Sequence, residues 1–152
     1  MGARTLDRAK NTALRLLKVR NRSAQEIRRR LKAKRFSASV IQQTVAYLKN
    51  LKYLDDRQFA RNWITTRLKK PLGIHRITAE LKERGVAQKI IEAEMARCTN
   101  GYQETAIISE MAQRRAERYE GVPREKMQQR VFAYLVRRGF NIEAVQQIVK
   151  QL

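Results

Sequence analysis

Helix-breaking and cross-linking residues are scarce in this sequence, which has 2 prolines, 6 glycines and 1 cysteine among 152 residues. So few breakers favour long helices over an architecture of strands and turns. The lone Cys98 excludes an intramolecular disulfide, and the single His75 excludes a metal site built on a pair of histidines. No stretch approaches the roughly 20 apolar residues that span a membrane. The first residues also lack the apolar segment of a secretory signal, so we expect a cytoplasmic protein.

Acidic side chains are scarce as well: 14 Asp and Glu stand against 34 Lys and Arg, a net charge of +20. Self-repulsion of this size destabilises a compact chain, so the composition indicates a polyanionic partner that contains nucleic acid. The excess is uneven: residues 1–50 carry 14 basic and 2 acidic side chains (net +12), residues 51–100 carry 11 and 6 (net +5), and residues 101–152 carry 9 and 6 (net +3). We expect the first third of the chain to lead the electrostatic contact.

What the sequence does contain is apolar residues at helical spacing, in three copies of one pattern. Each copy predicts a helix, a tight turn, an apolar residue and a second helix. The aligned positions are Ile27, Leu31, Phe36, Val40, Ile41, Val45 and Leu48 in the first copy; Ile77, Leu81, Val86, Ile90, Ile91, Met95 and Cys98 in the second; and Val131, Leu135, Phe140, Ala144, Val145, Val149 and Leu152 in the third. This alignment makes Cys98 a small core residue rather than a nucleophile.

The turn between the two helices has glycine in two of the three copies. Gly85 and Gly139 each follow a basic residue, and glycine at such a position ends a helix in the left-handed conformation without steric cost. The first copy has Arg35 instead. Either Arg35 accepts a left-handed backbone at a cost of about 1 kcal/mol, or this turn is built differently.

A further amphipathic helix precedes each pair, at about residues 5–20, 55–69 and 102–119. The side chains expected to face inward are Leu6, Ala9, Ala13, Leu16 and Leu17 in the first, Phe59, Trp63 and Leu68 in the second, and Ala106, Ile107, Met111 and Tyr119 in the third. The sequence therefore predicts an all-α protein of three tandem three-helix repeats, at residues 1–52, 53–100 and 101–152. Because each unit of about 50 residues must lean on its neighbours, we expect an elongated and curved array.

Polar residues mark several helix starts. Two pairs have the spacing of a capping box, and two single residues suit the first positions of a helix: Ser23 with Glu26, Asp55 with Gln58, Pro123, and Asn141. The Asp55–Asp56 pair resembles the paired-aspartate motif of reverse transcriptases, whose chemistry needs a third carboxylate and two metal ions. Here the aspartates open a helix, so we interpret them as caps for its free amides. With no glycine-rich phosphate loop and no catalytic Ser or Cys context, we expect no enzyme, no cofactor and no metal.

Basic residues form clusters that we interpret as anion contacts rather than as a solvated face, because few acids interleave with them. The candidates are Arg4, Arg8, Arg15 and Lys18 on the outer side of the first helix; Arg28, Arg29, Arg30, Lys32, Lys34 and Arg35 around the second; and Lys69, Lys70 and Arg76 beside Pro71. A second set is expected to have structural roles: Tyr53, Leu54, Asp55, Asp56, Phe59, Gly85 and Gly139.

The segment Lys52–Ala60, read Lys-Tyr-Leu-Asp-Asp-Arg-Gln-Phe-Ala, resembles the most recognisable block of the RecX family, regulators of the bacterial RecA recombinase. Gly73–Ile77 and Glu80–Val86 resemble the next block of that family, and Ala13–Leu17 with Arg22–Leu31 resemble its first block. The resemblance covers essentially the whole chain. It implies a fold of tandem three-helix repeats, the architecture that the periodicity predicts on its own.

The resemblance also implies a function. RecX proteins bind RecA and RecA–DNA filaments in the helical groove, and they inhibit recombinase, strand-exchange and coupled ATPase activity within DNA repair and the SOS response. The implied partners are RecA, its filament on DNA, and single- or double-stranded DNA bound weakly and without sequence preference. The family has no catalytic residues to carry over and no cofactor, and we expect a monomer.

Two other classes of function stay open on the sequence. A helix, a tight turn and a helix are compatible with a sequence-specific DNA-binding repressor, although no helix starts with a base-reading set of Arg, Asn and Gln. A repressor would protect one site in footprinting, whereas a filament regulator would need RecA. A nuclease or polymerase accessory built on Asp55 and Asp56 would lose a metal-dependent activity when both are replaced by Asn.

Overall fold

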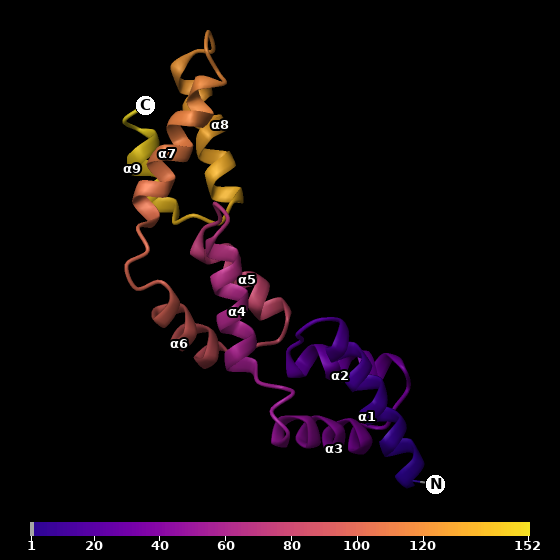
Figure 1. The fold of residues 1–152 in the computed structure, drawn as a ribbon. Coiled ribbons are helices and arrows are strands. Elements are labelled where there is room, and N and C mark those ends of the chain that lie inside the picture. Colours follow the sequence, from indigo (N-terminus) through magenta and orange to yellow (C-terminus); the bar gives the residue numbers. More distant parts are fainter. Residues whose placement is uncertain (1) are drawn as a thin grey trace. The chain divides into compact units, whose positions relative to one another are not determined.

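The computed structural model describes residues 2–152, and within that range its regular structure consists of nine helices and no strands. In chain order the helices are α1 (Gly2–Val19), α2 (Ala24–Ala33), α3 (Ala38–Asn50), α4 (Asp56–Leu68), α5 (Ile74–Glu83), α6 (Gln88–Cys98), α7 (Glu104–Glu117), α8 (Arg124–Arg137) and α9 (Ile142–Val149) (Figure 1). The all-α prediction is confirmed, and the first helix of each repeat lies close to its expected bounds.

In the first repeat, α1, α2 and α3 pack on one another around a common core. Ile27, Leu31 and Leu48 are fully buried in it, as the aligned pattern predicts. The contribution of α1 centres on Ala9 and Ala13, which are also fully buried, while the leucines of α1 are half-buried at the edges. Small side chains at the centre let α1 approach α3 closely, and the larger leucines close the sides of the contact.

In the third repeat, α7, α8 and α9 form a core of the same design. Val131, Leu135 and Val145 are fully buried, at positions that the alignment assigned to the core. The predicted inward face of α7 is partly wrong, because Ala106 is exposed and Ile108, which the prediction omitted, is fully buried. Two residues along an α-helix correspond to a rotation of about 200°, so choosing Ala106 in place of Ile108 moves that residue to the opposite side.

In the middle repeat, five of the seven aligned positions are buried: Ile77, Leu81, Val86, Ile91 and Met95. Ile90 and Cys98, which the alignment also assigned to the core, are half-buried. On α4 the buried residues are Phe59, Ala60 and Ile64, whereas Trp63 is only half-buried. The contacts within the chain divide it into two compact units. The first contains the residues through Trp63 with Leu81–Met95, and the second contains Ile64–Glu80 with Ala96–Leu152, so the middle repeat contributes to both.

The turn after the second helix of each repeat has the hydrogen bonds of a Schellman motif. The amide after the turn residue reaches back five residues to a helix carbonyl in all three: Phe36 to Leu31 (3.2 Å), Val86 to Leu81 (3.1 Å) and Phe140 to Leu135 (3.4 Å). The turn residues Arg35, Gly85 and Gly139 have φ angles of 63°, 73° and 82°. Arg35 therefore accepts the left-handed backbone, the first of the two alternatives that the sequence left open.

Consecutive repeats meet at a joint, where the start of one repeat's second helix contacts the turn of the next repeat. In the first joint the hydroxyl of Ser23 donates to the carbonyl of Arg84. The amide of Ala24 donates to the carboxylate of Asp56 (2.8 Å), the first residue of α4. The free amides at the start of α2 are thus capped partly by the neighbouring repeat, which the sequence pattern does not reveal.

The second joint repeats this arrangement with different residues. The amide of Gly73 donates to the carbonyl of Arg138 (2.9 Å), and the amide of His75 donates to the carbonyl of Gly139 (3.1 Å). The amide of Ile74 donates to the carboxylate of Glu104 (3.1 Å), the first residue of α7. At both joints, therefore, an acid at the start of one repeat caps a free amide at the start of the second helix of the preceding repeat.

Besides the left-handed backbone, close packing at the joints also requires glycine at positions 85 and 139. A Cβ on Gly85 would lie 2.4 Å from Cγ of Gln25, and a Cβ on Gly139 would lie 2.3 Å from Cβ of Arg76. Arg35 is exposed, so its side chain has room that the later turns lack. Glycine is therefore needed where a preceding repeat packs on the turn.

Candidate functional site

The Asp55–Asp56 pair has two structural partners. Asp55 precedes α4, and its carboxylate accepts the amide of Gln58 (3.0 Å), which is the expected cap. Asp56 faces the other way and caps Ala24 in the first joint. The side chain of Gln58 donates to Asn62 (2.8 Å) rather than completing a capping box.

The remaining predicted caps are found at their helices. Ser23 and Glu26 form a complete capping box at the start of α2. Asn141 caps α9 by accepting the amide of Ala144 (3.0 Å), and Pro123 directly precedes α8.

Ten basic side chains of the first repeat form what we name the first-repeat cation set: Arg4, Arg8, Arg15, Lys18, Arg28, Arg29, Arg30, Lys32, Lys34 and Arg35. All are exposed except Arg28, which is half-buried. Within residues 2–152, none of them forms an ion pair. The first 50 residues hold only two acids, and one of these, Glu26, is already paired with Arg20 (2.8 Å). Among the described residues, the first-repeat cation set therefore presents positive charge that no carboxylate pairs.

Glu26 is held as a carboxylate by its surroundings. Burial by itself would raise its pKa, but hydrogen bonds from Arg20 and from the Ser23 amide, together with the charges of Arg20 and Arg84, bring the pKa below its ordinary value. Glu26 thus stays ionised and neutralises Arg20. It pairs with no member of the first-repeat cation set.

Two of the candidate residues also serve the joints. Arg29 donates to the carbonyl of Glu83 in the first joint (2.8 Å). Arg76 pairs with Glu80 (3.4 Å) and donates to the carbonyl of Arg137 in the second joint (3.5 Å). Lys69 and Lys70, the other members of the middle cluster, are exposed beyond the end of α4. Arg76 therefore has structural partners in Glu80 and the carbonyl of Arg137, whereas no ion pair is observed for Lys69 or Lys70 among the described residues.

Three segments of the chain match the helical domains that define one protein family. Residues 9–48 match the first three-helix domain of RecX, residues 55–95 match the second, and residues 102–149 match the third. The chain belongs to the RecX family. It is 32% identical to the Regulatory protein RecX of Prosthecochloris aestuarii over 146 residues, covering 95% of this chain and 93% of that protein. It is 33% identical to the Regulatory protein RecX of Serratia proteamaculans over 161 residues, covering 91% and 94%.

Solved RecX structures share the fold. One crystal structure of a regulatory protein RecX superposes with a TM-score of 0.86 at 19% identity, over 97% of this chain and 74% of that one. RecX from Lactobacillus salivarius superposes with a TM-score of 0.82 at 20% identity, over 99% and 97%. The predicted family and the predicted fold of three tandem three-helix domains are confirmed.

Among the described residues, none of the helices combines the length and the apolar character that a membrane span requires.

This RecX chain also contains charged contacts that sequence reasoning missed. In the middle repeat the guanidinium of Arg84 lies 3.8 Å from the ring centroid of the half-buried Trp63, a cation–π contact. Arg61 pairs with Glu94 (2.9 Å), whose side chain is only 4% exposed. Trp63 and Arg61 lie on α4, whereas Arg84 follows α5 and Glu94 lies on α6, so no local spacing in the sequence could have linked these partners.

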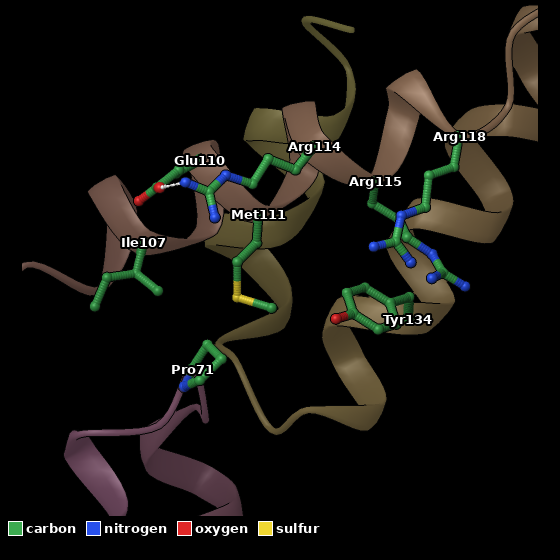
Figure 2. A pocket seen from close by; sticks show the side chains of 8 residues that line it. All are labelled: Pro71, Ile107, Glu110, Met111, Arg114, Arg115, Arg118 and Tyr134. Carbon is green, nitrogen blue, oxygen red and sulfur yellow. Dashed lines mark ion pairs between the residues drawn. The ribbon is translucent and has the colours of Figure 1, made fainter.

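The third repeat of this RecX chain has a pocket of about 280 Å³ that the sequence also did not reveal. Figure 2 shows the residues that line it: Pro71, Ile107, Glu110, Met111, Arg114, Arg115, Arg118 and Tyr134. The guanidinium of Arg115 lies 4.5 Å from the ring centroid of Tyr134, and that of Arg138 lies 5.3 Å from the same centroid. The one trace of this pocket in the sequence is the spacing of its α7 residues, because residues three and four apart on a helix share a face.

Proposed function

We propose that the chain binds RecA and RecA–DNA filaments in the helical groove, and that it thereby inhibits recombinase, strand-exchange and coupled ATPase activity. The proposal rests on membership of a family whose named members are regulatory proteins, and on one observation in this chain, the first-repeat cation set. A filament offers acids on protein and phosphates on DNA, and a surface of unpaired cations suits both. No observation favours catalysis or a sequence-specific repressor over this function.

The repeated architecture supports the same function. Three similar domains on one chain allow contacts with more than one site of a repetitive filament. Once the first contact forms, the following ones are intramolecular and benefit from a high effective concentration. Individually weak contacts are then sufficient for inhibition at low protein concentration.

The function is tested by RecA-driven ATP hydrolysis on single-stranded DNA, with the purified chain titrated in at substoichiometric amounts. We expect hydrolysis to fall well before one chain is present per RecA protomer. Unchanged hydrolysis at a stoichiometric amount of the chain would reject the proposal.

The roles of the repeats are tested by charge reversal. Replacing Arg28, Arg29 and Arg30 by Glu is expected to weaken inhibition more than the same replacement of three arginines at the end of α7, Arg114, Arg115 and the C-cap residue Arg118. Because Arg29 also supports the first joint, a second variant replaces Arg30, Lys32 and Lys34, which are exposed and leave that joint intact. Equal losses from the first-repeat and third-repeat variants, at equal helicity by circular dichroism, would contradict the leading role of the first repeat.

A further inference from the structure

The pocket of the third repeat combines an apolar floor with a basic rim. Ile107 and Met111 lie one helical turn apart on α7, and the ring of Pro71 lies beside them (Figure 2). Arg114 and Arg115 follow on the same helix, Arg118 is its C-cap residue, and all three line the pocket as well. Such a surface can bind an apolar group and negative charge side by side.

The arginines differ in how far their charge is already used. Arg114 pairs with Glu110 (2.6 Å), and both side chains are exposed. Arg115 is half-buried against Tyr134, and its Nε is buried without a hydrogen-bond partner. In the part of the chain that the structure describes, neither Arg115 nor Arg118 forms an ion pair. Both residues line the pocket, so a carboxylate that enters it can pair with guanidinium groups that no acid of the described chain already occupies.

The shape and lining of the pocket favour a peptide over nucleic acid. A volume of about 280 Å³ is at the lower end for ligand sites and suits a single side chain better than a cofactor. Bases of single-stranded DNA bind proteins by stacking on aromatic rings. The only ring that lines the pocket, that of Tyr134, already has the guanidinium groups of Arg115 and Arg138 over it, so the floor is mainly aliphatic and thioether surface.

We propose that this pocket binds an extended acidic segment of a partner protein. One apolar side chain of the segment inserts against Ile107 and Met111, and the flanking carboxylates bind Arg115 and Arg118. The inference deepens the proposed function, because it gives the third repeat a protein ligand while the first repeat leads the contact with phosphates. Its test uses neither RecA nor DNA filaments, so its failure is distinguishable from failure of the proposed function.

The test is a binding measurement on the full chain with a methyl-labelled methionine at each of its 4 methionine positions. The probe is a capped peptide, Glu-Glu-Phe-Glu-Glu, titrated in and followed by methyl NMR. We expect a saturable shift of the Met111 methyl signal, with the signal of buried Met95 on α6 as an internal reference. The charge-matched peptide with Gly in place of Phe is expected to bind roughly 10- to 100-fold more weakly, because it cannot bury an aromatic side chain.

A matched pair of variants separates the pocket from general positive charge. Arg115→Gln with Arg118→Gln should weaken binding of the Phe peptide at least tenfold, because both carboxylate partners are lost. Arg124→Gln with Lys126→Gln removes the same charge from exposed positions at the start of α8 and should leave the affinity nearly unchanged. Equal losses in the two variants would overturn the site assignment.

The remaining outcomes also decide the question. Equal affinity for the Phe and Gly peptides would mean that the apolar floor is not used, and the proposal would fail. A saturable shift of Met111 with an oligothymidine of equal charge, at equal or higher affinity, would make the pocket a nucleic-acid site. A shift of Met111 that appears on raising the concentration of the chain alone would make a second copy its occupant.

Discussion

Replacing Gly139 by alanine tests how much the second joint contributes to stability. Gly139 has a φ of 82°, where an L-residue pays a conformational cost of about 1–2 kcal/mol. The added Cβ would lie 2.3 Å from Cβ of Arg76 and 2.5 Å from its backbone nitrogen. Backbone cannot yield as a flexible side chain can, so the start of α5 must move away from the turn.

The magnitude follows from the contacts that this movement breaks. The joint holds two backbone hydrogen bonds, from Gly73 to Arg138 (2.9 Å) and from His75 to Gly139 (3.1 Å). Losing both at about 0.5–1.5 kcal/mol each, in addition to the conformational cost, gives a total loss of about 2–5 kcal/mol. We expect Gly139→Ala to lower the free energy of unfolding by that amount in urea titrations followed by far-ultraviolet circular dichroism.

Gly121→Ala is the matched control. Gly121 has a φ of 78°, and a Cβ there would meet nothing within 4 Å, so this variant reports the conformational cost alone, about 1–2 kcal/mol. Gly85→Ala should fall between the two, because it would strike Cγ and Cβ of Gln25, of which only Cγ can rotate away, but no backbone atom. A Gly139→Ala variant no less stable than Gly121→Ala would refute the argument, since the joint would then have contributed nothing.

Four further outcomes are expected. Arg35→Gly should stabilise the chain by up to about 1 kcal/mol in the same titrations, because it relieves a left-handed arginine that packs against no preceding repeat; a loss of stability would contradict this. Glu26 has a folded pKa below its ordinary value of 4.5, so its contribution is complete above that pH and is lost as the pH falls through the folded pKa; Glu26→Gln should flatten the acid limb of stability against pH, and an unchanged limb would exclude the effect. Asp56→Ala should cost about 0.5–2 kcal/mol through loss of the cap on Ala24, with Asp56→Asn costing less; equal costs would mean that the acceptor oxygen is not what matters. If about six phosphates are neutralised, DNA affinity should fall roughly thousandfold between about 50 and 200 mM salt, and a flat response would contradict electrostatic binding.

The sequence by itself determined the helices, the three-fold repetition and most residues of each core. Helical periodicity is a local property, so positions such as Leu31, Leu81 and Leu135 could be aligned and are all fully buried. The left-handed turns and the caps at Ser23 and Asn141 are equally local, because their hydrogen bonds close within a few residues. The choice of Ala106 over Ile108 failed because Ile107 and Ile108 are adjacent on α7, so its apolar residues spread over more than one side and do not fix which side faces inward.

Only the tertiary structure decided which groups from different helices meet. The cap of Asp56 on Ala24, the stacking of Arg84 on Trp63 and the pocket beside Met111 each join residues that are far apart in the chain. Such partners depend on how one repeat docks on the next, and amphipathic helices of similar pattern can dock in several ways. The first-repeat cation set lies between these cases. Its charge could be read from the sequence, but only the structure shows that the few acids of that repeat are placed where they form no ion pair with its members.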